Sequence, residues 1–184
     1  MRKDILKLYF VAIVPEGKVF DEILAFKNEM SDRFNSKAAL RSPPHITLHM
    51  PIKWQEENEN KLIAPLSELA SRYKPFNVNL QGFGAFQPRV IYVKVEENMV
   101  LDALQAAIQK TARSVWHIYP KSTNTRPFNP HVTIGFRDLN KPMFFKAWQE
   151  FEQRDYVSTF QVKDICLLKH NGKSWDIFHR SPLH

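Results

Sequence analysis

Two short segments of the chain place a proline, a histidine and a threonine at the same spacing. Residues 42–50 read SPPHITLHM and residues 128–136 read FNPHVTIGF. His45 and Thr47 of the first segment therefore correspond to His131 and Thr133 of the second. Random placement predicts about 0.2 His-x-Thr triplets in a chain of this composition, and two are present. The matched pair points to a shared chemical role.

In a β-strand, side chains two positions apart point to the same side. Each segment, if extended, presents an imidazole and a hydroxyl next to each other. We expect His49 to share the face of His45 and Thr47, and Gly135 to share the face of His131 and Thr133. The opposite side, facing the core, is then expected to hold Ile46, Leu48 and Met50 in the first segment and Val132, Ile134 and Phe136 in the second.

Two histidines that meet across a cleft have the properties that phosphodiester transfer requires. Histidine titrates near pH ~6.5, so one neutral and one protonated imidazole coexist near neutrality. The neutral ring accepts a proton from the attacking water or hydroxyl, and the charged ring donates one to the leaving oxygen. Threonine hydroxyls stabilise charge on the phosphate oxygens. This chemistry needs no metal and no cofactor, and we expect neither.

The charge of the chain favours an anionic partner. The net charge is +7, and no acidic residue occurs between Asp32 and Glu56 or between Asp102 and Asp138. Each of these two windows contains one His-x-Thr motif. The cations within them are Arg33, Lys37, Arg41 and Lys53 in the first window and Lys110, Arg113, Lys121, Arg126 and Arg137 in the second. Positive potential concentrated around both motifs indicates an anion site.

The hydrophobic pattern predicts an α+β protein with a mainly antiparallel sheet. Alternation predicts strands over residues 6–14, 45–52, 76–86, 89–96, 131–137, 157–168 and 174–180. Helical spacing predicts helices over residues 18–34, 57–72, 98–115 and 141–153, with Pro65 a candidate kink in the second. Residues 169–174 contain an Asn-Gly pair that predicts a hairpin turn. The motif histidines are 86 residues apart, close to half the chain of 184, which favours an internal duplication.

The chain resembles the two-histidine (2H) phosphoesterase superfamily. The resemblance is carried by the motif pair PPHITL and RPFNPHVTIGF, together with the strands LYFVAIVP and RVIYVKV. The similarity is to its branch of bacterial 2′-5′ RNA ligases and RNA 2′,3′-cyclic phosphodiesterases, and it covers essentially the whole chain. It implies one domain over 1–184 with a pseudo-two-fold axis, and two antiparallel sheets lining a central cleft with helices outside. The lobes are expected over roughly 1–90 and 91–184, with exchange of strands between them left open.

By the same resemblance, His45 and His131 form the acid–base pair, and Thr47 and Thr133 bind the phosphate. The implied activity is hydrolysis of cyclic or 2′-5′ phosphodiesters, with reversible joining of RNA ends in some members. The implied partners are RNA 2′,3′-cyclic phosphate ends, 2′-5′ linked oligonucleotides or small cyclic nucleotides. The roles of acid and base are not assigned individually.

Further residues are candidates for substrate contacts. Tyr92 matches a position where relatives of the family place an aromatic ring beside the base. The candidates for contact with the phosphate are His49, Lys53, Arg126 and Arg137. Trp54, Trp116 and Phe128 are candidates for base stacking or for the core. Cys166, the single cysteine, is expected to be a buried structural residue.

Two other functions fit parts of the sequence. A non-catalytic RNA-binding module on the same fold would explain the charge pattern. A metal hydrolase with His45, His49 and His131 as ligands is favoured less, because this His-x-x-x-His stretch reads as a strand. No apolar run approaches the ~18 residues of a membrane span. We therefore expect a cytoplasmic monomer without membrane attachment.

Overall fold

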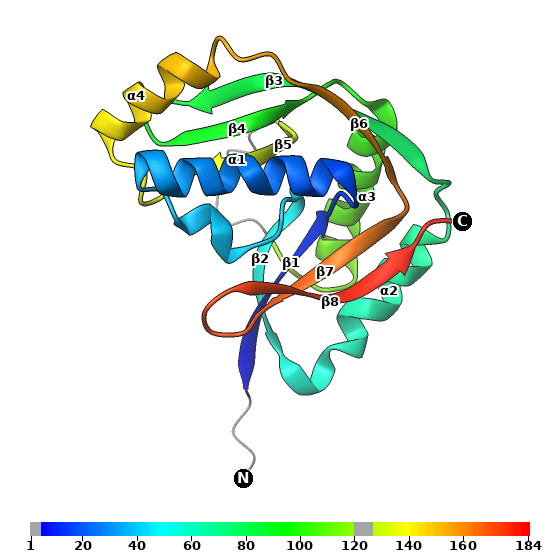
Figure 1. Ribbon diagram of the computed structural model, residues 1–184. Helices are drawn as coiled ribbons and strands as arrows, with labels where there is room; N and C mark the ends of the chain where they lie inside the picture. Colours follow the sequence, from blue (N-terminus) through cyan, green and yellow to red (C-terminus); the bar gives the residue numbers. More distant parts are fainter. Residues whose placement is uncertain (1–4, 120–126) are drawn as a thin grey trace.

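The computed structural model describes residues 5–119 and 127–184, in which strands and helices alternate along the chain (Figure 1). The strands are β1 (Leu6–Ile13), β2 (Ile46–Gln55), β3 (Phe76–Phe86), β4 (Val90–Val95), β5 (His131–Gly135), β6 (Val157–Val162), β7 (Asp164–His170) and β8 (Trp175–Pro182). The helices are α1 (Lys18–Phe34), α2 (Asn60–Ala70), α3 (Met99–Ser114) and α4 (Lys141–Phe151), with short 3₁₀ helices η1 (Ala38–Arg41) and η2 (Glu56–Asn58). The predicted α+β class is confirmed.

The strands form one curled sheet in the order β6-β3-β4-β5-β2-β1-β7-β8, and each neighbouring pair is antiparallel. The expectation of two separate sheets is not confirmed, because the halves are joined at the centre. There, β2 and β5 pair through Ile46 and Val132, and within the described residues this is their single paired position. The two motif strands are therefore direct neighbours that diverge from one point.

The halves of the sheet exchange elements relative to the halves of the sequence. β3 lies beside β4, whereas β7 and β8, from the end of the chain, extend the half that contains β1 and β2. The helices cross over in the same way, since α1 joins β1 to β2 but packs on β5, and α3 joins β4 to β5 but packs on β2. The repeated strand–helix–strand units are thus interlocked around one continuous core.

A β-bulge follows the His-x-Thr motif in both strands. In the pairing of β1 with β2, Ala12 lies opposite Thr47 and Val11 opposite His49, so Leu48 is the extra residue. In the pairing of β4 with β5, Tyr92 lies opposite Thr133 and Ile91 opposite Gly135, so Ile134 is the extra residue. A bulge reverses the alternation of the side chains beyond it. The same irregularity at equivalent positions supports the inferred duplication.

The bulges correct the predicted assignment of faces. His49 is 8 % exposed and Met50 is 70 % exposed, the reverse of what simple alternation predicts. His49 lies against Trp116, with 6.3 Å between the ring centroids, whereas Met50 and Phe136 line the same cavity as His45. The expectation that His49 shares the face of His45, and that Met50 and Phe136 belong to the core, is therefore wrong.

The last part of the chain contains one strand more than predicted. Residues 157–168 form β6 and most of β7, which are separated at Lys163. β6 pairs with β3 and β7 pairs with β1, so the chain passes here from one half of the sheet to the other. The apolar residues on both sides of the break are so close in sequence that they read as one strand. The hairpin turn between β7 and β8 is confirmed, with Gly172 at φ 103°.

Two other expectations concern buried and apolar segments. α2 continues through Pro65 instead of splitting there. Cys166 is fully buried in a small apolar cluster with Phe10 and Leu168, as predicted. Over residues 5–119 and 127–184, none of the helices has both the length and the apolar character needed to cross a membrane.

Candidate active site

The two motifs lie on neighbouring strands at the centre of the sheet. Ile46 and Val132 are fully buried in the core. Because successive side chains of a strand point to opposite faces, the residues on either side of these two point away from the core. His45 and Thr47 therefore share the face of His131 and Thr133, across the line where β2 and β5 diverge. The sequence-based juxtaposition of the two motifs agrees with this register.

Each motif histidine has its tautomer fixed by its own backbone. The Nδ1 atom of His45 lies 2.8 Å from the Pro43 carbonyl oxygen, and the Nδ1 atom of His131 lies 2.7 Å from the Asn129 carbonyl oxygen. A carbonyl oxygen can only accept, so Nδ1 donates in both cases. In the neutral ring, Nε2 then carries the free lone pair. Both imidazoles are thus prepared to accept a proton at Nε2.

An aromatic ring from the adjacent strand packs on each histidine. Phe10 of β1 lies 4.9 Å from His45, and Tyr92 of β4 lies 4.9 Å from His131, measured between ring centroids. Phe86 also contacts His131, at 5.2 Å. These rings hold the imidazoles and shield them from water. The structure therefore brings Tyr92 to the position beside a histidine that the sequence predicted.

Burial lowers the pKa of both histidines. The pKa of His45 is lowered to about 4, first by burial, then by the charges of Lys27 and His131, against the opposing hydrogen bond to Pro43. The pKa of His131 is lowered by burial, against the hydrogen bond to Asn129. Both rings are therefore neutral at pH 7 in the free protein. A bound phosphodiester anion favours the protonated form and raises both values.

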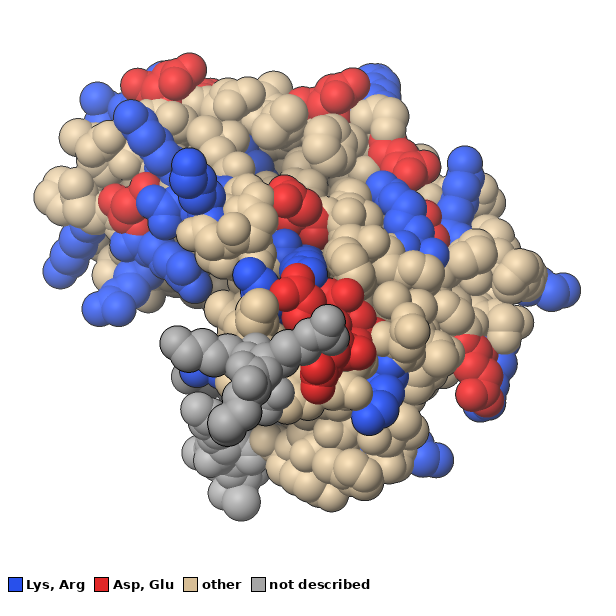
Figure 2. Space-filling model, turned by 90° about the horizontal axis from the view of Figure 1, so that it is seen from below, with Lys and Arg blue, Asp and Glu red and all other residues tan. Residues whose placement is uncertain are grey.

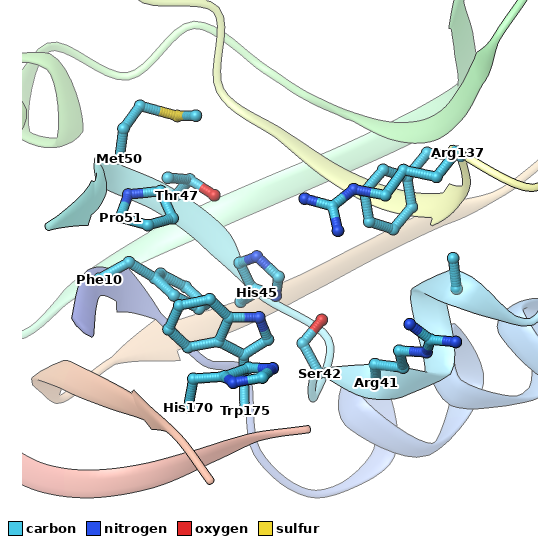
Figure 3. A pocket seen from close by; sticks show the side chains of 12 residues that line it. Phe10, Arg41, Ser42, His45, Thr47, Met50, Pro51, Arg137, His170 and Trp175 are labelled. Carbon is cyan, nitrogen blue, oxygen red and sulfur yellow. The ribbon is translucent and has the colours of Figure 1, made fainter. Parts of the chain in front are cut away.

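A cavity of about 190 Å³ opens beside His45 and Thr47 (Figure 3). The residues that line it are Phe10, Ala38, Arg41, Ser42, His45, Thr47, Met50, Pro51, Phe136, Arg137, His170 and Trp175. His131 and Thr133 are not among them and belong to the neighbouring strand. Figure 3 shows the guanidinium of Arg137 and the hydroxyl of Thr47 pointing toward the centre of the cavity. None of the lining residues is acidic, which suits an anionic ligand.

The lining residues that were not selected from the sequence as substrate contacts include Arg41, Ser42, His170 and Trp175. His170 ends β7 and Trp175 begins β8, and their rings pack at 4.9 Å. Trp175 also packs on Phe10 at 4.7 Å. The sequence feature that could have identified His170 and Trp175 is the Asn-Gly turn, which places their two rings opposite each other in a hairpin. Only the sheet order shows that this hairpin extends next to β1 and the cavity.

Several predicted contacts do not reach the cavity. His49 lies on the core side, and its Nδ1 atom donates to the Met50 carbonyl oxygen at 2.8 Å. Lys53 lines a separate hollow at the far end of β2, together with Trp54 and Lys61. Arg126 lies outside the described residues. Trp116 is buried and Phe128 packs against the core, so their core alternative fits the structure better than base stacking.

The placement of His49 also bears on the metal alternative. His49 and His45 point to opposite sides of the sheet, so they cannot join His131 around one ion. Within the ranges described, no group of three or more His, Cys, Asp or Glu side chains is arranged to hold a metal ion.

Cations surround the cavity and continue beyond it. Figure 2 shows Lys and Arg side chains gathered at the end of the molecule where α4 and the C-terminal end of α1 lie. The exposed cations of these segments are Arg33, Lys37, Lys141 and Lys146. Arg41 and Arg137, both exposed, connect this surface with the cavity. Arg33, Lys37 and Arg41 of the first acid-free window and Arg137 of the second thus lie toward the same end of the molecule.

Comparison with known proteins identifies the family of the chain. Residues 19–174 match the family model described as the 2′-5′ RNA ligase superfamily. The chain is 29 % identical over 174 residues to a "putative phosphoesterase" of Geobacillus kaustophilus and 32 % identical over 174 residues to one of Geobacillus thermodenitrificans. Each alignment covers 92 % of this chain and 92 % of the relative.

Solved structures with similar folds are more distant in sequence. TT0787 of Thermus thermophilus superposes with a TM-score of 0.69 at 20 % identity, covering 96 % of this chain and 97 % of that one. Escherichia coli LigT, solved as a complex with 3′-AMP, superposes with a TM-score of 0.66 at 18 % identity, covering 97 % and 99 %. With its matched histidines and its relatives among phosphoesterases, the chain belongs to the 2′-5′ RNA ligase superfamily of 2H phosphoesterases.

Proposed function

We propose that the protein is a metal-independent phosphodiesterase that acts on RNA 2′,3′-cyclic phosphate ends or on related 2′-5′ and cyclic nucleotide phosphodiesters. The observation that carries this proposal is the pair of neutral imidazoles on adjacent strands, each with Nδ1 bound to a backbone carbonyl and Nε2 free. The complexes of LigT with 3′-AMP, ATP and phosphate support a phosphate-bearing nucleotide as the ligand class.

The reaction needs two proton transfers and one displacement at phosphorus. Nε2 of one histidine accepts a proton from water while the water oxygen bonds to phosphorus. The bond between phosphorus and the 2′- or 3′-oxygen of the ribose breaks, and the other histidine, protonated when the anion binds, donates its proton to that oxygen. Each transfer contributes typically ~10²–10⁴ in rate. The same displacement, with the 5′-hydroxyl of a second RNA end in place of water, joins RNA ends.

The polar groups around the histidines match the charge on the phosphate. The hydroxyls of Thr47 and Thr133 donate hydrogen bonds to the non-bridging oxygens, where negative charge accumulates in the transition state. Arg137 supplies a cation from the end of β5, and its backbone there is left-handed with φ 60°. Arg41 supplies a second cation from the end of η1. Trp175 and Phe10 offer an apolar wall for a nucleobase.

The test is a substrate panel with metal-free enzyme in excess chelator: a 2′,3′-cyclic mononucleotide, an RNA with a 2′,3′-cyclic end, a 2′-5′ dinucleotide and ADP-ribose cyclic phosphate. We expect His45→Ala and His131→Ala each to lower kcat by ~10²–10⁴ and to retain most of the nucleotide affinity. His179→Ala is the matched control, because His179 lies on β8 and contacts Ser67 of α2.

The pH profile gives an independent check on the acid–base pair. The base must be neutral and the acid protonated, so kcat/KM is expected to be bell-shaped with its optimum below pH ~6.5, since both pKa values are lowered in the free protein. Nucleotide binding without turnover on any substrate would identify a binding module. Turnover that depends on added metal would contradict the mechanism.

A further inference from the structure

Lys27 occupies a position where the packing favours an apolar residue. The buried side of α1 contains Val19, Ile23, Lys27, Met30 and Phe34, and Lys27 is only 1 % exposed. Burying an ammonium group costs free energy unless it is paired. An apolar side chain of similar length would avoid this cost, and such a violation of the local pattern is typical of a functional position.

The ammonium of Lys27 is bound by backbone carbonyls at one end of the cavity wall. Its Nζ atom donates to the carbonyl oxygens of Ala39, at 3.1 Å, and Ser42, at 3.0 Å. The segment between these two carbonyls carries Arg41 and Ser42, whose side chains line the cavity. His45 follows three residues later. Lys27 therefore fixes the backbone from which one cation and one hydroxyl enter the cavity.

The beginning of the same segment is fixed from the second motif strand. Asp138, which follows β5, accepts hydrogen bonds from the Ser36 hydroxyl at 3.0 Å and from the backbone amides of Lys37 and Ala38 at 2.8 and 2.9 Å. The α1–β2 connection is thus held at its start by Asp138 and at its end by Lys27. Asp138 directly follows Arg137, one of the cations that line the cavity. Both of its carboxylate oxygens accept hydrogen bonds from the start of the α1–β2 connection.

The charge of Lys27 acts on one histidine of the pair. The charged and titratable groups around His45 are Lys27 on α1, His131 on β5, Arg41 at the end of η1, Arg137 after β5 and His170 on β7. All of these are basic. Among the neighbouring charges, that of Lys27 lowers the pKa of His45 most, whereas the pKa of His131 is lowered by burial. Burial is the larger cause at both rings, and Lys27 adds a charge effect at His45.

We propose that Lys27 is a positioning residue of this site, which ties the Ala39–Ser42 segment to α1 and brings a buried positive charge to the His45 side of the histidine pair. The consequence for turnover rests on the proposed function.

Two variants of Lys27 separate its charge from its hydrogen bonds. Lys27→Met removes both, whereas Lys27→Gln removes the charge and keeps an amide N–H donor for the two carbonyls. The control is Lys18→Met, because Lys18 lies at the exposed start of the same helix. The pKa of His45 is measured in each protein by NMR titration of its Cε1–H signal, which is assigned by its loss in His45→Gln. This measurement requires no substrate.

We expect the pKa of His45 to rise by about 1 unit or more in both Lys27 variants, and to stay unchanged in Lys18→Met. We expect inorganic phosphate, titrated by NMR, to bind about tenfold more weakly to Lys27→Met than to Lys27→Gln, because the amide restores the tie. An unchanged His45 pKa in either folded Lys27 variant would overturn the charge effect. Equal phosphate affinity in the two variants would overturn the positioning role.

The effect of Lys27 on turnover is tested by the pH dependence of kcat/KM on a 2′,3′-cyclic mononucleotide. In Lys27→Gln the acid limb should move to higher pH together with the pKa of His45, while the alkaline limb moves less. A profile identical to that of the wild type would show that the charge of Lys27 does not act on the pair during turnover. If the wild-type protein turns over no substrate, the proposed function fails, and the NMR titrations still decide the effect of Lys27 on His45.

Discussion

The pH dependence of stability should reveal the cost of burying Lys27. Burial lowers the pKa of Lys27 from 10.5 to about 7. The unfolded chain therefore binds more protons than the folded chain between these two pH values, and stability rises with pH across this window. Below pH 7 the full cost is present. The interval between the two pKa values corresponds to about 5 kcal/mol, and the part up to pH ~10 corresponds to about 4 kcal/mol.

Lys27→Met removes this dependence along with the charge. We expect the stability of the variant relative to the wild type to be highest near pH 6 and to fall by up to about 4 kcal/mol as the pH rises to about 10. The assay is urea unfolding at intervals across this range, with free energies from linear extrapolation. Lys18→Met should show no such trend. A difference between Lys27→Met and wild type that stays constant over the range would refute the reasoning.

Two further substitutions test the surroundings of the histidines. A Cβ atom at Gly84 would lie 2.5 Å from Cε2 of Tyr92, so Gly84→Ala must displace the ring that packs on His131. We expect this variant to lose about 1–3 kcal/mol in stability and to have a lower kcat. Wild-type values of both would show that the ring has no role in the site. Trp175→Ala should raise KM for a nucleotide by about tenfold or more, in the range of a lost base stack, and leave the affinity for inorganic phosphate unchanged. An equal loss of affinity for both ligands would exclude a role of Trp175 in nucleobase binding.

The local elements were predictable because their patterns are long and clearly ended. The predicted ranges 18–34 and 76–86 match α1 and β3 at both ends. The missed boundary at Lys163 has a physical reason, since alternation reports which side chains are buried and not which strand lies beside them. β6 alternates and β7 is buried over residues 165–168, yet the two strands belong to opposite halves of the sheet. Pairing partners are set by long-range packing, which a period of two residues does not encode.

The side-chain orientations of the motif residues were predictable as far as the two β-bulges. The spacing of His45 and Thr47 placed them on one face because no irregularity falls between them. The extra residue at Leu48 comes directly after the motif and turns His49 into the core, and nothing in the string HITLHM marks it. The unusual position of Lys27, in contrast, was detectable from the sequence. A lysine at helical spacing with Val19, Ile23, Met30 and Phe34 interrupts an apolar helix face.

The near-symmetry of the two motifs and the buried lysine are connected. The backbone carbonyl at Nδ1, the aromatic ring from the adjacent strand and the following bulge are the same for His45 and His131. Hydrolysis needs two different protonation states, which a duplicated arrangement alone does not favour. A charge that acts on one ring makes the pair unequal, and α1 supplies it because that helix crosses over to pack on β5. The exchange of helices between the halves thus lets one buried side chain distinguish two histidines with nearly identical neighbours.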